Sequence, residues 1–191
     1  MKITKLVLIM AIAFSAHSTL QANELKPNCP AYSKCQTDLQ SLIDHKDVLE
    51  SWLSSATRKQ ATMDSVAQIA YSSEYFETRL ESLRLLEIST LSLHGLVRGK
   101  AITLTRSIAL RSNNEELELE AIRILSNPMN SFVVDVAFMA ISAVEDIALN
   151  SQSEYVKLFA ESILQGRIHA VNKYTRERAQ EALAKIQTAG K

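Results

Sequence analysis

A recurrence every 39 residues is the feature that most restricts how this 191-residue chain can fold. Segments that start at Thr57, Leu96, Asp135 and Tyr174 align one beneath another without a gap. Apolar or small residues recur in the alignment at i, i+4, i+7 and i+8, which places them on one face of an α-helix. The recurrence therefore predicts equivalent helices. One column contains only isoleucine: Ile69, Ile108, Ile147 and Ile186.

The same register continues through the segment after each of the first three copies and predicts another helix there, so that each unit contains two helices. Leucine recurs at Leu80, Leu119 and Leu158. The apolar columns of this helix cover more than half of a helical wheel, as expected for a helix with neighbours on several sides. The whole chain has only three prolines and four glycines, which are too few turn-forming residues for an all-β fold. We therefore expect an all-α fold built from helix pairs.

Polar and helix-breaking residues divide these units at consistent places. Gly95, Asn127-Pro128 and Gly166 predict the bend between the two helices of a unit. Turns rich in serine and asparagine fall at 72–73, 112–114 and 150–153. Side-chain oxygens at helix starts accept backbone N–H groups, and three such capping pairs are predicted: Thr57 with Gln60, Asn113 with Glu116, and Ser151 with Glu154.

An ungapped two-helix unit of this length resembles the repeat of the HEAT family. The second helix of that family opens with an apolar residue followed by Arg, and Val97-Arg98 and Thr175-Arg176 resemble this step. The resemblance implies that residues 57–191 stack into a short right-handed α-solenoid. It also implies that the second helices line the concave side, which is a surface suited to a partner.

The segment before the stack, residues 23–56, is predicted to close its first end. A weaker helical pattern runs through residues 33–56 and includes Leu42, Leu49, Trp52 and Leu53. Because the end units of a repeat stack must cover an apolar face, we expect this helix to act as a cap.

The first 22 residues have the pattern of a secretory signal peptide. Lys2 and Lys5 precede an apolar run from Leu6 to Phe14, and small and polar residues follow. Cleavage after Ala22 is favoured, with Ser18 as an alternative. The other interpretation, an N-terminal membrane anchor, requires an apolar run long enough to cross about 30 Å of hydrocarbon. We therefore expect an exported protein, periplasmic or secreted.

Two cysteines, Cys29 and Cys35, follow the predicted cleavage site and are separated by five residues. In an oxidising compartment a close pair of this kind is best interpreted as a disulfide that closes a small loop. A redox-active pair is the alternative, although the spacing is not Cys-x-x-Cys.

Charge argues against two classes of partner. The chain carries 21 basic and 21 acidic residues, and loss of Lys2 and Lys5 with the signal leaves 19 against 21, a net charge of −2. Nucleic acid requires a basic field, and an anionic lipid surface attracts basic segments. We therefore expect neither nucleic-acid binding nor membrane insertion after signal cleavage.

The helical wheel of the second helices predicts which side chains face outward on the concave side. Phe138 stands out because it is a large apolar group where water is expected; it is either an interface anchor or ordinary packing against a loop. The candidate partner-binding residues are Gln60, Asp64, Thr103, Arg106, Phe138, Ser142, Glu145, Glu177 and Glu181.

No motif in the sequence predicts catalysis or a cofactor. His45, His94 and His169 are not at metal-ligand spacing, and no nucleophile motif or glycine-rich phosphate loop occurs. The many carboxylates are typical of solvated helix faces. We therefore expect no catalytic, metal or cofactor site. The favoured function is a protein-binding module of the cell envelope; the alternatives are an inhibitor or immunity protein of a secreted enzyme or toxin, and an envelope hydrolase with a cleft between repeats.

Overall fold

The computed structural model describes residues 34–189, and over this range the protein is all-α. The predicted fold class is confirmed at this level, since the described residues contain helices and no strand. The predicted signal peptide lies outside the described residues. The helices are α2 (Lys34–Glu50), α3 (Ala56–Ser72), α4 (Phe76–Thr90), α5 (Gly95–Ser112), α6 (Glu115–Ser126), the short 3-10 helix η2 (Pro128–Asn130), α7 (Val134–Asn150), α8 (Glu154–Gln165) and α9 (Lys173–Ala189).

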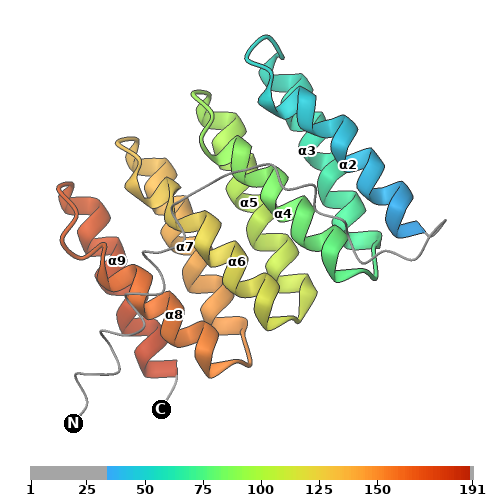
Figure 1. The fold of residues 1–191 in the computed structure, drawn as a ribbon. Coiled ribbons are helices and arrows are strands. Elements are labelled where there is room, and N and C mark those ends of the chain that lie inside the picture. The colour runs from blue at the N-terminus through green and yellow to red at the C-terminus, as the bar shows by residue number, and fades with distance from the viewer. Residues whose placement is uncertain (1–33, 190–191) are drawn as a thin grey trace, which may run out of the picture.

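These helices form two layers (Figure 1). One layer consists of α3, α5, α7 and α9, in which each helix contacts the next, and the other consists of α2, α4, α6 and α8. All connections between the layers fall at two opposite ends of the molecule (Figure 1). We call the end with the connections 51–55, 91–94, 127–133 and 166–172 the bend end. The end with the connections 73–75, 113–114 and 151–153 is called the turn end.

The helices of one layer begin at a constant interval of 39 residues. Their first residues are Ala56, Gly95, Val134 and Lys173, and α4, α6 and α8 begin at 76, 115 and 154 with the same interval. The aligned isoleucines therefore occupy the same position, thirteen residues after the first residue of each helix. Three of them are buried, at 108, 147 and 186, and the one at 69 is partly buried against the same core.

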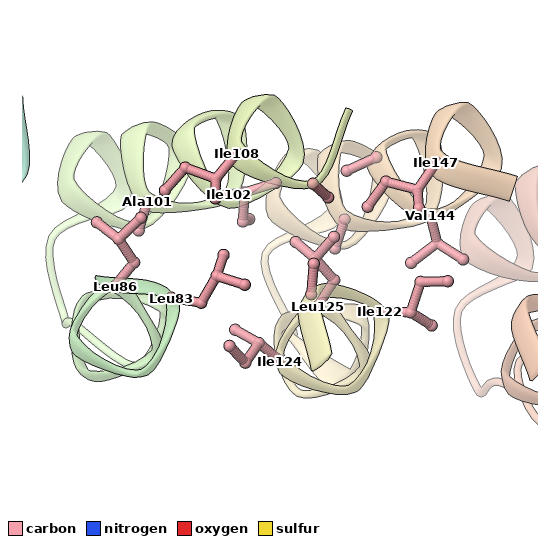
Figure 2. Packing of buried hydrophobic residues seen from close by; sticks show 14 of the residues in the cluster. Leu83, Leu86, Ala101, Ile102, Ile108, Ile122, Ile124, Leu125, Val144 and Ile147 are labelled. Carbon is pink, nitrogen blue, oxygen red and sulfur yellow. The ribbon is translucent and has the colours of Figure 1, made fainter. Parts of the chain in front are cut away.

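The core lies between the two layers and joins successive helices of each layer. In Figure 2, Leu83 and Leu86 of α4 point towards α5, and Ile124 points from α6 towards α4. Burial of each such side chain contributes about 1.5–3 kcal/mol relative to exposure. Alanines that are completely buried at 101, 140 and 179 allow neighbouring helices to approach closely. The core is therefore continuous along the row of helices.

The N-terminal helix α2 packs on α3 and α4 at one end of the row. Leu42 and Leu49 are buried in the shared core, and Lys59 Nζ donates a hydrogen bond of 2.8 Å to the Leu49 carbonyl. The predicted extent of this helix was wrong at its C-terminal end. Trp52 and Leu53 lie beyond the last residue of α2, in the first bend, and are exposed.

The predicted N-caps were displaced by one or two residues. The side chains of Ser55, Asn114 and Ser153 accept the backbone N–H groups of Arg58, Leu117 and Tyr155 at 3.2, 3.0 and 3.2 Å. Asn113 instead ends α5 in the left-handed conformation, with φ of 46°. The Ser151 hydroxyl donates to the buried Glu118 carboxylate at 2.5 Å. Thr57 lies within the first turn of α3.

Cys35 is fully buried at the start of α2. Its Sγ atom lies 3.7 Å from Thr78 Oγ1, which belongs to the neighbouring helix α4. Cys29 lies outside the described residues, so the Cys29–Cys35 disulfide stays a prediction.

Candidate functional site

The predicted partner-binding residues lie on the layer formed by α3, α5, α7 and α9, but their exposure differs. Because these helices lie side by side (Figure 1), their outward positions share one face. Exposed members are Asp64, Thr103, Glu177 and Glu181. Gln60, Arg106, Phe138 and Ser142 are partly buried, and Glu145 is buried.

The outward placement of Glu145 was wrong. Only 5% of this residue is exposed, because Arg178 and Lys185 of α9 cover its carboxylate. Arg178 donates to one carboxylate oxygen and Lys185 to the other, the latter at 2.7 Å. Burial raises the pKa of Glu145, but the hydrogen bonds and positive charges of Lys185 and Arg178 outweigh it, and its pKa is lowered from 4.5. Glu145 is therefore a link between α7 and α9.

Other charges on this face also join successive helices. Lys100 of α5 contacts Asp64 of α3 at 2.5 Å, and Arg106 of α5 contacts Asp146 of α7 at 2.8 Å. Each of these four side chains is partly exposed, so each pair contributes about 0.2–1 kcal/mol. These charged side chains are thus paired between successive helices of the layer.

Phe138 forms the wall of an open pocket. The pocket has a volume of about 410 Å³ and is also lined by Val134, Asp135, Met139 and Tyr174. It lies where α7 and α9 begin, and four of its five lining side chains are apolar or aromatic. The side chain of Phe138 is partly buried, and whether it anchors a partner stays a prediction.

Gly99 of α5 lies against Met139, one of the side chains that line the pocket. A side chain at position 99 would place its Cβ atom 3.3 Å from Cε of Met139. The end of the Met139 side chain therefore packs closely against Gly99, and a side chain at position 99 would require it to shift slightly. This outward position of α5 serves local packing beside the pocket.

The bend end carries a row of exposed apolar side chains that the sequence did not reveal. Trp52 is 87% exposed and Leu93 is 97% exposed, and Phe132 and Val171 are fully exposed. Leu93, Phe132 and Val171 are separated by 39 residues, so they recur at the same position of three successive bends. This spacing is visible in the sequence, but in the sequence-based prediction the bends only divide the helices. Further exposed apolar residues at this end are Leu53, Leu91, Leu96, Val133 and Tyr174.

Charge is also unequally divided between the two ends of the molecule. We compared, at each end, the connections and the first four residues of the helix that follows. At the bend end these residues include six basic groups and one acidic group: Arg58, Lys59, Arg98, Arg167, Lys173, Arg176 and Asp135. At the turn end they include two basic and six acidic groups: Arg79, Lys157, Glu74, Glu77, Glu115, Glu116, Glu118 and Glu154. The last four residues of the preceding helices add Asp47, Glu50, Glu87 and Arg123 at the bend end and Arg111 at the turn end.

Arg176, one of these basic residues, is hydrogen-bonded to the backbone of the bend that precedes α9. One of its guanidinium nitrogens donates to the carbonyls of Ala170 and Val171, both at 2.9 Å. Lys59 occupies the corresponding position of α3 and likewise donates to a carbonyl, that of Leu49. These side chains brace the bends next to the exposed apolar residues.

The described residues do not bring the histidines into a cluster. Between residues 34 and 189, no group of three or more His, Cys, Asp or Glu side chains is arranged to hold a metal ion. Within the same range, no helix is both long enough and apolar enough to cross a membrane. No protein-family model and no curated protein sequence matches this chain.

Proposed function

We propose that this chain is an exported HEAT-like repeat protein that binds another protein through the face formed by α5, α7 and α9. The repeat interpretation is supported by helices that begin every 39 residues in both layers. An open apolar pocket on this face supports the binding function. Export rests on the predicted signal peptide and on the predicted disulfide.

The pocket and its surroundings have the composition of a small interface. Phe138, Met139 and Tyr174 provide an apolar centre that can accept one large side chain of a partner. Arg106 of α5 and Asp146 of α7 form an accessible ion pair further along the same face, which can offer polar contacts to a partner. A partner with an apolar anchor surrounded by polar groups fits this surface.

Capture from an envelope extract tests the binding function. Mature wild-type chain is expected to retain one protein in stoichiometric amount, and Phe138→Ala is expected to lose it. Leu158→Ala is the matched control, because Leu158 is an exposed apolar residue on α8 in the other layer. A photo-crosslinking residue at position 139 should label the same protein. The proposal fails if no protein is retained, or if both variants lose it equally.

Mass measurement and alkylation test the export interpretation. Processed protein is expected to begin at Asn23, after removal of residues 1–22. Without reductant, alkylation of the unfolded exported chain should modify neither Cys29 nor Cys35, and with reductant it should modify both. An unprocessed chain, or thiols that react without reductant, would contradict export through an oxidising compartment.

A further inference from the structure

Each of the four bends exposes at least one large apolar side chain to water. Trp52, Leu93, Phe132 and Val171 contribute almost nothing to the core, since their surface is nearly all accessible. Exposed apolar surface costs about 25 cal/mol per Å² relative to burial. Single exposed residues are common in soluble proteins, but a row of them along one end marks an interaction surface.

The arrangement of these side chains favours a flat occupant. The four bends lie together at one end of the row of helices (Figure 1). Leu93, Phe132 and Val171 occupy the same position in successive bends, and all three are almost fully exposed. A pocket holds one side chain, whereas a row of projecting side chains can enter a planar apolar phase together. This geometry differs from that of the pocket beside Phe138.

The charges at the bend end favour an anionic occupant. The bends and the four helix residues on either side of each carry seven basic and four acidic groups, although the chain as a whole is neutral. Helix starts normally favour acidic residues. Yet α3, α5 and α9 have none in their first turns and α7 has only Asp135, while α4, α6 and α8 all have at least one. Among the basic groups, Arg58 and Lys173 are exposed.

We infer that the bend end docks on the surface of an anionic phospholipid bilayer. Trp52, Leu93, Phe132 and Val171 enter the interfacial region, and the basic groups lie at the level of the headgroups. Docking at this depth requires no spanning helix. A second copy placed bend end against bend end would oppose like charges. This inference goes beyond the proposed binding of a protein partner, because it concerns the bends and not the helix face beside Phe138; the two regions adjoin at Asp135 and Tyr174.

The single tryptophan of the chain gives a direct test, because Trp52 lies at the bend end. The mature chain is mixed with phosphatidylcholine vesicles that contain about a third phosphatidylglycerol, and with vesicles of phosphatidylcholine alone. Binding is measured by sedimentation, and the environment of Trp52 by its emission. We expect binding to the anionic vesicles, a blue shift of the emission, and weaker binding as salt is raised.

Matched variants separate this surface from the rest of the molecule. The double variant Leu93→Ser and Phe132→Ser should weaken vesicle binding by about tenfold or more, since it removes two inserted side chains. Both residues are exposed, so the fold should persist. The double variant Tyr155→Ser and Leu158→Ser, which changes exposed residues of α8, should bind like the wild type.

Three results of the vesicle experiments would overturn the inference. They are the absence of vesicle binding, binding without a blue shift of Trp52, and equal loss in the two double variants. Retention of an acidic protein by the bend end in place of vesicles would also overturn it. Phe138→Ala should leave vesicle binding intact, so failure of the pocket and failure of this surface can be told apart.

Discussion

Replacement of Glu145 by Gln is expected to destabilise the fold more than any comparable change on the same face. The carboxylate of Glu145 is buried and accepts hydrogen bonds from Arg178 and Lys185. Gln keeps the shape of the side chain but removes the charge. The guanidinium of Arg178, whose side chain is only 13% exposed, would then lack its counter-charge.

The size of the effect follows from the burial of the two partners. Removing one member of a fully buried ion pair costs about 3–5 kcal/mol. Lys185 is 59% exposed and can return to water, and Gln retains one hydrogen-bond acceptor. We therefore expect the free energy of unfolding to fall by about 2 kcal/mol. For a chain of this length that loss lowers the melting temperature by about 4–8 °C.

Asp146→Asn provides a matched control one residue away. The ion pair of Asp146 with Arg106 is 2.8 Å long, but both side chains are more than a third exposed. Such a pair is worth about 0.2–1 kcal/mol, so the control should cost less than half as much. Urea unfolding at pH 7, followed by circular dichroism, measures both free energies.

The pH dependence gives a second measurement of the same link. Because the pKa of Glu145 is lowered from 4.5 in the folded state, the charged carboxylate stabilises the fold above pH 4.5. This contribution is lost as the pH falls through the lowered folded pKa. The difference in stability between wild type and Glu145→Gln should therefore be constant near pH 7 and should shrink below pH 4.5. A difference that is independent of pH, or that equals the difference for Asp146→Asn, would refute a buried charge link.

Further substitutions test three local features of the fold by urea unfolding. Ser55→Ala should cost about 1 kcal/mol because it removes the cap of α3, whereas Thr57→Ala should change stability by less than about 0.5 kcal/mol. Equal losses would mean that Ser55 is not the cap. Asn113→Ala should cost about 1 kcal/mol and Asn113→Gly should not, because the backbone at this position is left-handed; a well-tolerated alanine would contradict that conformation. Ile147→Ala should cost about 2–5 kcal/mol, and a loss below 1 kcal/mol would contradict its place in the core.

The sequence predicted those parts of the structure that depend on periodicity. The all-α class and the positions of the turns follow from the spacing of apolar residues, because burial of one helix face is what that spacing produces. The caps were less predictable. Serine and asparagine are clustered at each turn, and several of them can satisfy a helix start, so backbone geometry decides between Asn113 and Asn114.

Glu145 illustrates a different limit. A helical wheel describes one helix and therefore shows which side of α7 Glu145 faces, but it does not include the neighbouring helix. In the structure Arg178 and Lys185 extend from α9 and cover that side. An acidic residue on the outward side of a helix is therefore exposed only if the adjacent helix lacks long basic side chains at the matching height. That condition involves positions 33 and 40 residues further along the chain.

Net charge is a similarly incomplete description of the surface. Equal numbers of acidic and basic residues suggested that no anionic surface is a partner, because an average over the chain assumes that the charges are mixed. They are instead separated by the way the chain alternates between two ends: every bend and the helix start after it lie at one end, and every turn lies at the other. The basic groups therefore add along one end, where the exposed apolar side chains also lie. In a row of antiparallel helices, charge is informative when it is counted separately for the two ends.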